Sequence, residues 1–392
     1  MIINFPTIGD YNQALLSDGN LAFSLLKSLD FIPSRTFPIK VFLFGSGAYA
    51  VVFKAKGTKM YAVRCFLTTD NENIRRYSLI CDRLNEITAK WKVECLFLKD
   101  EIRVKGKCYP VLRMDWVEGD LLNVFITNNL RNKSVLGEIQ KQLVCISEEL
   151  ELYDLGHGDL QCGNIMVQGN AGDFQLKLID YDGMYISNFN KLQSLENGRS
   201  EFQHPKRTLR DFSSKIDRFS IWVMLTALEA LKSNPDLWKE VMQGGYNTLD
   251  NMLFTGVDFQ SVSTSRIFNE LSRIDSEALR FYLSKLKLFS ENDFDLIGKP
   301  ILYNDENDTS YLKVIDNSIV KYDVPGGLLG SNEVLIESYP NNANVLTSMF
   351  SRLGNTPLVI DRDLYFGKTI IVSYAGIHKR ILVNDSVVKV EF

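Results

Sequence analysis

The chain has 392 residues, of which 45% are hydrophobic and 23% charged, and its formal net charge is -4 at pH 7. This length predicts two or three domains with hydrophobic cores of their own. The slightly acidic balance excludes a chain-wide nucleic-acid footprint, so we expect no nucleic-acid partner and interpret the short basic cluster Lys206, Arg207 and Arg210 as solvated.

The cysteines and the apolar segments indicate the compartment. The six cysteines form no Cys-x-x-Cys pair, which favours free and mostly buried thiols in a reducing environment. The N-terminus has no basic region followed by an apolar core, and the longest apolar stretch, 219–231, is too short to cross a bilayer. We expect a cytoplasmic protein without a secretory signal or membrane contact.

Strand-like runs with one helix predict a small β-rich region, 37–117, after an N-terminal extension of residues 1–36. Two of these runs flank a turn rich in glycine. Glycines let a backbone approach phosphates closely, so the turn predicts a phosphate-binding loop, with an ordinary hairpin as the alternative for a lone copy. The turn reads Gly45-Ser46-Gly47-Ala48-Tyr49-Ala50.

A strand over 61–64 follows this turn and ends at Arg64, a cation that could reach the phosphates. Two interpretations of Arg64 stay open: contact with phosphate, which we favour, and a solvated strand residue of an inactive protein. An acidic partner would come from the next helix, 72–86, although a solvated charge is the simpler interpretation of each acid there. The candidates are Glu72, Asp82 and Glu86.

A larger helical region, 118–299, contains a loop with the pattern of a phosphoryl-transfer site. The helix 136–155 runs into His157-Gly158-Asp159-Leu160-Gln161-Cys162-Gly163-Asn164. On such a loop the carboxylate of Asp159 can orient a substrate hydroxyl while the amide oxygen of Asn164 helps to hold a metal ion. Asp180 follows an apolar run, and its carboxylate is the expected second metal ligand, because magnesium prefers hard oxygen ligands. A turn at 169–173 predicts a hairpin that brings Asn164 and Asp180 together.

The rest of the sequence predicts a surface loop, then further helices, and finally a region of short strands. The Asn, Ser and Gly content of 181–206 suits a mobile loop, and helical patterns follow at 219–231, 237–242 and 265–288. Residues 300–392 consist of short strand-like runs between turns, which predict a small all-β domain without catalytic motifs. A structural appendage and a docking module stay open as its role. The runs lie at 311–315, 318–322, 334–339, 358–366, 369–374, 380–383 and 387–392.

Taken in order, these motifs resemble a bacterial protein-kinase-like family with the eukaryotic-like Ser/Thr kinase fold, over about 5–294. The resemblance implies an α+β, bilobal protein-kinase-like fold, with an N-lobe at 37–117 and a C-lobe at 118–299, followed by the additional small C-terminal all-β domain. The segments that carry it are Phe5-Pro6-Thr7, Gly45-Ser46-Gly47, Ala62-Val63-Arg64-Cys65-Phe66, Met114-Asp115-Trp116-Val117-Glu118-Gly119, His157-Gly158-Asp159-Leu160-Gln161, Ile179-Asp180-Tyr181-Asp182-Gly183-Met184, Gln203-His204-Pro205 and Asp217-Arg218-Phe219-Ser220.

The family's roles transfer to matching positions. By this resemblance Asp159 is the catalytic base, Arg64 contributes to catalysis from the place where most kinases have Lys, and Asn164 and Asp180 bind Mg²⁺ or Mn²⁺. Asp217 would hold the backbone of the catalytic loop, with a helix N-terminal acid as the alternative. The expected ATP-binding residues are Gly45, Ser46, Gly47, Ala48, Tyr49, Val52, Ala62, Arg64, Asp115 and Val117.

Two other departures from the eukaryotic pattern affect the mechanism. Gly158 replaces the Arg that docks a phosphorylated activation loop, which disfavours that mode of activation. Gln161 replaces a Lys near the transferring phosphoryl group, which predicts slow turnover unless Arg64 or a loop residue such as Lys191 or Arg199 compensates. We interpret neither His157 nor His204 as a general base: the resemblance implies that His157 is a packing residue and that His204-Pro205 ends the activation segment.

The resulting hypothesis is an ATP- and Mg-dependent protein Ser/Thr kinase. The resemblance implies protein substrates, with a PPM-type phosphatase and a von Willebrand A protein as partners in a tellurite-resistance-associated phosphorylation triad. Two alternatives stay open: a small-molecule phosphotransferase, which shares the His-Gly-Asp-Leu loop, and a nucleotide-binding pseudokinase that acts as a scaffold.

Overall fold

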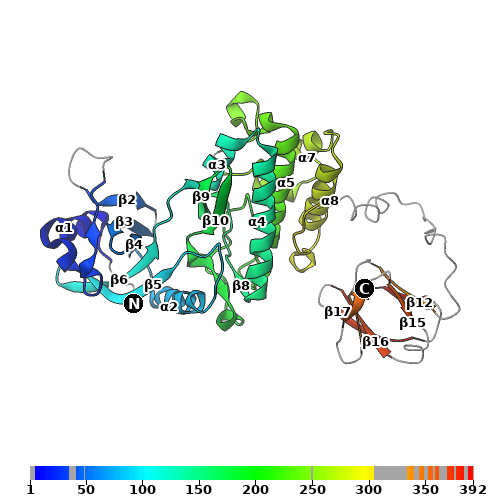
Figure 1. Cartoon of the computed structure of the whole chain (residues 1–392), viewed down its shortest axis with the longest axis horizontal. Helices are drawn as coiled ribbons and strands as arrows, with labels where there is room; N and C mark the ends of the chain where they lie inside the picture. The colour runs from blue at the N-terminus through cyan, green and yellow to red at the C-terminus, as the bar shows by residue number, and fades with distance from the viewer. Residues whose placement is uncertain are drawn as a thin grey trace. The chain divides into compact units, whose positions relative to one another are not determined.

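The computed structural model describes residues 5–34, 41–47, 49–248, 250–303, 333–339, 344–347, 352–355, 358–361, 369–374, 377–383 and 387–391. The chain divides into two compact units, Met1–Asn304 and Asp305–Phe392 (Figure 1). Helices and strands both contribute to the first unit, so the predicted α+β class is confirmed. No helix within the described ranges is long and apolar enough to cross a membrane.

The first unit begins with helix α1 (Ile8–Asp18), which packs on the sheet that follows. Thr7 and Asp10 cap its N-terminus reciprocally, each side chain binding the other's backbone N–H. The buried Tyr11 hydroxyl donates to the carbonyl of Phe66 at 2.7 Å. The N-terminal segment is therefore part of the folded unit and shares a hydrophobic core with Val51 and other sheet residues.

Six strands form an antiparallel sheet in which β3 and β4 are central. The strand order is β1-β3-β4-β6-β5, and β2 pairs with β3. Side chains alternate between two faces, so Val111 joins the core under α1 while its neighbour Leu112 faces helix α2. The strands are β1 (Asp30–Phe31), β2 (Leu43–Ser46), β3 (Ala50–Lys56), β4 (Met60–Phe66), β5 (Cys95–Val104) and β6 (Lys107–Asp115), and the helix is α2 (Asn71–Asn85).

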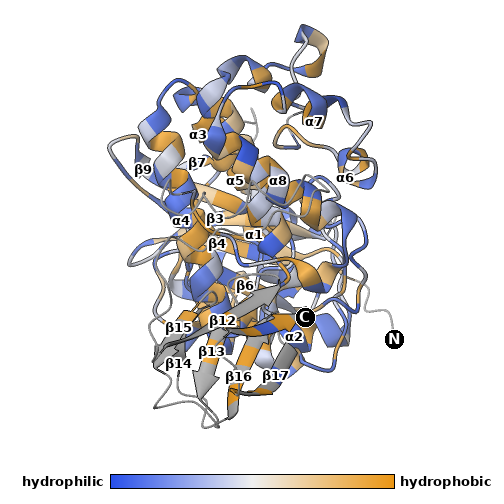
Figure 2. Ribbon diagram, turned by 90° about the vertical axis from the view of Figure 1, so that its right-hand side faces the viewer, coloured by the Kyte–Doolittle hydropathy of each residue, from blue (hydrophilic) through white to orange (hydrophobic). Residues whose placement is uncertain are grey.

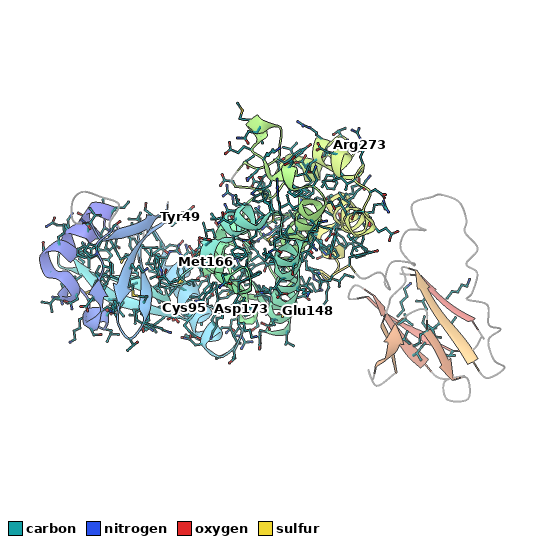
Figure 3. The ribbon with its side chains drawn as sticks, turned by 45° about the horizontal axis from the view of Figure 1, so that its top comes forward. Tyr49, Cys95, Glu148, Met166, Asp173 and Arg273 are labelled. Atoms are coloured by element: carbon teal, nitrogen blue, oxygen red, sulfur yellow. The ribbon has the colours of Figure 1, made fainter. Side chains whose placement is uncertain are left out.

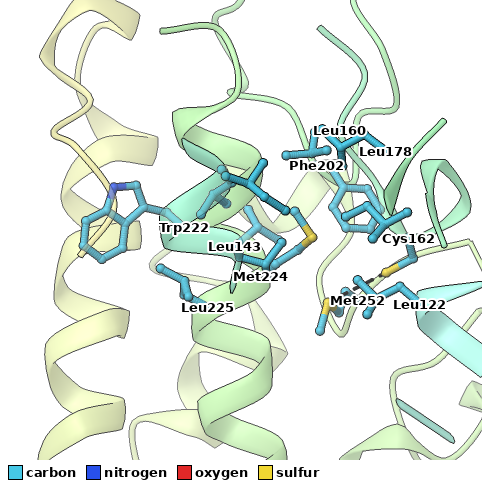
Figure 4. Packing of buried hydrophobic residues seen from close by; sticks show 14 of the residues in the cluster. Leu122, Leu143, Leu160, Cys162, Leu178, Phe202, Trp222, Met224, Leu225 and Met252 are labelled. Atoms are coloured by element: carbon cyan, nitrogen blue, oxygen red, sulfur yellow. Dashed lines mark hydrogen bonds between the residues drawn. The ribbon is translucent and has the colours of Figure 1, made fainter. Parts of the chain in front are cut away.

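The rest of the first unit is mainly helical and surrounds helix α5. Nearly every face of α5 is buried, so the stretch 219–231 is a core helix as predicted. Trp222, Met224 and Leu225 of this helix pack in the hydrophobic core (Figure 4). Amphipathic α4 lies beside it and carries both hydrophobic and hydrophilic residues (Figure 2). The helices are α3 (Leu122–Asn129), α4 (Lys133–Leu152), α5 (Arg218–Ser233), α6 (Gly256–Gln260), α7 (Arg266–Leu271) and α8 (Glu277–Glu291).

Two predicted helical stretches differ from the structure. The stretch 237–242 is not an α-helix but lies in two short 3₁₀ turns, Pro235–Trp238 and Val241–Gln243. The stretch 265–288 is split into α7 and α8, because Ser276 accepts a hydrogen bond from Leu279 N and starts a new helix.

The mainly helical part also contains short strands. The predicted hairpin is present as β9 (Ile165–Asn170) and β10 (Asp173–Leu178), with β7 (Asp120–Leu121) paired to β9. A second small sheet pairs β8 (Leu155–Gly156) with β11 (Tyr185–Ile186). The register of β9 and β10 sets Leu178 opposite Ile165, and Ile179 N donates to Asn164 O at 2.9 Å. Asn164 and Asp180 therefore belong to neighbouring chain segments.

In the second unit the described residues form two sheets around a small aliphatic core. One sheet has the order β15-β12-β18, in which β12 and β18 are parallel, and the other β14-β13-β16-β17. Orange hydrophobic residues mark β16 in Figure 2, and Ile370 and Val372 of this strand are fully buried. The predicted runs 311–315 and 318–322 lie outside the described residues. The strands are β12 (Glu333–Tyr339), β13 (Asn344–Thr347), β14 (Arg352–Asn355), β15 (Leu358–Asp361), β16 (Thr369–Tyr374), β17 (Ile377–Leu382) and β18 (Val387–Glu391).

Candidate functional site

A cleft of about 1160 Å³ lies in the first unit, between the six-stranded sheet and the helical part. Its walls come from the β2–β3 turn, strand β4, the end of β6, the loop after β8 and the turn after β10. Tyr49 and Met166, both labelled in Figure 3, line the cleft from the sheet side and from the hairpin side. The cleft therefore collects segments that are far apart in the sequence.

Most residues predicted to bind nucleotide or metal line this cleft. Ala48 lies outside the described residues, and Asn164 is not a lining residue but contacts one of them. The predicted residues that line the cleft are Gly45, Ser46, Gly47, Tyr49, Val52, Ala62, Arg64, Asp115, Val117, Asp159 and Asp180.

The glycine-rich turn leaves room above the cleft. Gly47 N donates to Ala50 O at 2.9 Å, which closes the turn between β2 and β3. A Cβ atom added to Gly45 or Gly47 would meet no described atom within 4 Å. Packing within the protein therefore does not explain these glycines, and the open space suits a ligand that approaches the backbone closely.

Arg64 is held by two carboxylates of the turn after β10. Its NH1 and NH2 donate to the two oxygens of Asp182, each at 2.5 Å, and NH1 also donates to Asp180 Oδ1 at 2.8 Å. The side chain is only 13% exposed. The interpretation of Arg64 as a solvated strand residue is therefore wrong.

None of the three candidate acids of helix 72–86 pairs with Arg64, in line with the simpler interpretation of each as a helix surface charge. Glu72 pairs with Arg76 at 3.2 Å and Glu86 pairs with Arg83 at 3.0 Å, both along the helix itself. Asp82 is exposed. The acids of α2 make local helical pairs, while the turn after β10 offers a carboxylate whose geometry matches the planar guanidinium fork.

The three charges at this point influence one another. Burial raises the pKa of Asp182 to about 6, with a further contribution from the nearby Asp180 carboxylate. Burial also opposes ionisation of Asp180, but the charge of Arg64, together with hydrogen bonding to Asp182 and Arg64 and the nearby His157, keeps the pKa of Asp180 below its usual value. At pH 7 one guanidinium faces two carboxylates, so this side of the cleft keeps an excess of negative charge that favours a cation.

Asp180 also has an unusual backbone conformation. Its φ of 64° and ψ of 75° lie in the left-handed region, which Asp tolerates better than most residues. Its side chain is 46% exposed and lines the cleft. Strained backbone of this kind concentrates at functional sites, where the surrounding structure holds it in place.

Asp159 is held by hydrogen bonds to both carboxylate oxygens. Arg199 N donates to Oδ1 at 3.0 Å, and Asn164 Nδ2 donates to Oδ2 at 2.9 Å and to the Asp159 carbonyl at 2.8 Å. The hydrogen bonds of the Asn164 amide use its nitrogen, so its oxygen can act as a metal ligand. Asp159 and Asn164 thus form one unit, as their spacing predicts.

The backbone of this loop is fixed by Asp217. Its carboxylate accepts from His157 N at 2.5 Å and from Gly158 N at 2.9 Å, and the side chain makes no cap hydrogen bond to its own helix. The predicted role of Asp217 in holding the loop is therefore confirmed, and its interpretation as a simple helix N-terminal acid is wrong. Burial raises the pKa of Asp217 above its usual value, although the two N–H groups and His157 oppose this.

The two histidines that sequence reasoning excluded as bases are both packed inside the protein. His157 is fully buried and its Nε2 lies 2.9 Å from Ile179 O. His204 binds Phe289 O through Nε2 at 2.8 Å and accepts a hydrogen bond from Lys206 N on Nδ1. The interpretation of His157 as a packing residue is confirmed, and His204 is also packed in the interior.

Sequence reasoning named Arg199 of the segment 194–207 as a candidate compensating cation but missed the other contributions of this segment. Glu196 and Arg199 line the cleft, and Ser194, Gln203 and His204 are buried, so this segment is more than a surface loop. Arg207 of this segment is 7% exposed and donates to Gly158 O of the loop 157–164 at 2.8 Å. The interpretation of Arg207 as solvated is wrong. Proximity to Lys206 and Arg210 in the sequence hid this buried role.

The candidate ligands for a magnesium ion are the side-chain oxygens of Asn164 and Asp180. Magnesium prefers a few hard oxygen ligands and keeps several waters, which fits the Asp180 carboxylate and the Asn164 amide oxygen. No group of three or more His, Cys, Asp or Glu side chains in the described part of the chain is arranged to hold a metal ion. The residues therefore suit an ion that arrives with a ligand supplying further oxygens, and not a metal cage built from protein alone.

No model of a known protein family matches the chain, and no curated protein matches it significantly.

Proposed function

We propose that the chain is an ATP- and Mg-dependent protein kinase that transfers the γ-phosphoryl group to Ser or Thr hydroxyls, built on a bilobal protein-kinase-like fold. One observation carries the proposal. The cleft gathers the glycine-rich turn, Arg64, Asp159 and Asp180 from four separate segments. Phosphoryl transfer needs these groups together, because it depends on positioning and charge stabilisation more than on covalent chemistry.

The cleft offers complementary contacts to each part of ATP. The open backbone at Gly45 and Gly47 suits the phosphates, and Arg64 provides a buried cation nearby. At the other end, Asp115 and Val117 belong to the connection after β6 and could offer backbone groups to adenine beside Val52 and Ala62. The volume of about 1160 Å³ is ample for a nucleotide.

Asn164 and Asp180 would hold the magnesium ion. Bound there with ATP, the ion would neutralise charge that develops on the transferring phosphoryl group. Asp159 would orient the acceptor hydroxyl and accept its proton, while Asn164 and Arg199 N fix its carboxylate in place. Asp217 keeps the loop backbone rigid around it.

A protein acceptor is supported by the chain between Asp180 and α5. Residues 181–217 contain short 3₁₀ turns and extended segments but no α-helix, whereas small-molecule phosphotransferases usually insert substrate-binding helices here. The segment passes Asp159 through Arg199, where an extended peptide could approach. A PPM-type phosphatase and a von Willebrand A protein, expected from the sequence resemblance, are the first candidate substrates.

The experiment that tests this proposal is a transfer assay with γ-labelled ATP. The purified chain is incubated with Mg²⁺ or Mn²⁺ and candidate proteins, and we expect label on protein Ser or Thr. Asp180→Ala and Asp159→Asn should each abolish the signal, while Asp236→Asn, at a side chain that is 71% exposed and does not line the cleft, should leave it unchanged. Label that persists in Asp180→Ala would refute the proposal.

A nucleotide-binding pseudokinase is the second candidate, and one contact favours it. Arg64 already binds Asp180, the residue that the kinase proposal assigns to the metal. Gln161 further lacks the charge that most kinases place near the phosphoryl group. Thermal stabilisation by ATP without transfer to any protein, in several metals, would favour this candidate, because a ligand that binds the native state raises its stability by mass action.

A further inference from the structure

We propose that Asp182 is the positioning residue that orients Arg64 in the cleft and leaves Asp180 available to a divalent cation; this inference rests on the proposed function. The contact is a paired fork, in which both oxygens of Asp182 accept from separate guanidinium nitrogens at 2.5 Å. Such a fork fixes both the position and the plane of the guanidinium. A single bond to Asp180 would fix neither.

Helix α2 does not provide this anchor. Its acids Glu72 and Glu86 are engaged with arginines of the same helix. Toward Arg64 the helix presents Tyr77, whose ring centre lies 5.9 Å from the guanidinium carbon, and Phe66 of β4 lies at 5.8 Å. These rings shield the cation and favour its charge, but they do not set its direction along the cleft.

The turn that carries Asp182 is rigid. Tyr181 is fully buried, and its hydroxyl donates to Leu178 O at 2.9 Å and accepts from Val93 N at 2.9 Å. On the other side, the carbonyl of Gly183 lies against Gly158 of the catalytic loop. Asp182 is therefore held from both flanks, and this rigidity lets it act as an anchor for Arg64.

The division of work between the two carboxylates follows from the hydrogen-bond count. Arg64 makes three hydrogen bonds, two to Asp182 and one to Asp180. If Asp180 turns to a cation, Arg64 keeps the two bonds to Asp182 and stays oriented. If Asp182 lacked its charge, Asp180 would become the main counter-charge of Arg64, and a metal ion would have to compete with the guanidinium for it.

The test measures Mn²⁺ binding by electron paramagnetic resonance in the presence of ADP, which requires no turnover. The proteins are the wild type, Asp182→Asn, Arg64→Gln and the double variant. We expect Asp182→Asn to weaken Mn²⁺ binding about tenfold, in the range of energetic coupling between neighbouring groups. The double variant should recover most of this loss, because the competing guanidinium is gone. A purely structural role of Asp182 would not produce this recovery.

Glu72→Gln serves as the control on helix α2 and should change Mn²⁺ affinity by less than about twofold. Unchanged Mn²⁺ affinity in Asp182→Asn, or an equal loss in Glu72→Gln, would overturn the inference while leaving the proposed kinase intact. Failure to recover in the double variant would also overturn it. If the wild type binds neither ADP nor Mn²⁺, the proposed function fails and the inference fails with it.

Discussion

A Cβ atom on Gly158 would lie 2.3 Å from the carbonyl oxygen of Gly183, so the loop 157–164 and the turn after β10 are in close backbone contact at this point. Gly158 also has a φ of +83°, in the region that favours glycine. The position of Gly158 is therefore closed to any side chain in this protein. This contact ties Asp159 to the turn that carries Asp180 and Asp182.

Gly158→Ala is expected to destabilise the protein more than the backbone cost alone. That cost is about 1–2 kcal/mol for a left-handed residue, and the clash with Gly183 adds to it. Gly106→Ala is the matched control, because Gly106 has a φ of +79° and no described atom within 4 Å of an added Cβ. Urea unfolding of both variants gives the comparison. Equal losses of unfolding free energy in the two variants would contradict a tight contact between Gly158 and Gly183.

Asp217→Ala is expected to cost about 2–5 kcal/mol of unfolding free energy, because it leaves the N–H groups of His157 and Gly158 buried without their acceptor. Asp217→Asn keeps one acceptor oxygen and should cost less. Asp236→Asn, with a side chain that is 71% exposed, should stay within about 0.5 kcal/mol. Chemical denaturation measures all three. A wild-type stability in Asp217→Ala would contradict the role of this carboxylate.

His204 is expected to make the protein less stable in mild acid. Burial lowers the pKa of His204 below its ordinary value of 6.5, so below that pH the unfolded chain binds more protons than the native protein. Stability should therefore rise with pH through this window and fall as pH drops from about 6.5, by at most about 1.4 kcal/mol per pH unit from this group.

The check on His204 is a comparison of two pH profiles. Urea unfolding between pH 5 and pH 8 is measured for the wild type and for His204→Gln, which cannot titrate. The wild-type curve should be steeper between pH 5 and 6.5, and the two curves should run parallel above pH 7. Parallel curves over the whole range would show that burial does not shift His204.

Arg218→Lys is expected to lower the unfolding free energy by about 1–3 kcal/mol. Arg218 binds both oxygens of Glu151 at 2.7 and 2.8 Å, and the two side chains are 11% and 13% exposed. Lysine cannot reproduce this fork between α4 and α5. Arg280→Lys is the control, because its partner Asp275 is 99% exposed and such pairs contribute little. Similar thermal unfolding of both variants would contradict the expectation.

Several features of the site followed from the sequence because their causes are local. The hairpin of β9 and β10 was predicted from a turn between two apolar runs, and it joins Asn164 to Asp180 as expected. The core helix α5 followed from its apolar composition. The fixed distance from Asp159 to Asn164 along one loop also predicted that their side chains act together.

The partners of charged residues could not be predicted in the same way. The carboxylates that bind Arg64 lie 116 and 118 residues away in the chain, and their neighbours in sequence gave no sign of it. Arg207 appeared to belong to a solvated basic cluster, yet it is buried against Gly158. Such choices depend on which surfaces meet after the elements have packed.

By itself, the sequence determined the local elements with strong signals, such as the hairpin of β9 and β10 and the core helix α5, because periodicity, capping and turn residues act over a few neighbouring residues. Only the tertiary structure decided that Asp182, and not an acid of α2, holds Arg64, and that Gly158 must lack a side chain. The physical reason is that several acids could satisfy one arginine, and the choice among them falls to packing between segments far apart in the chain.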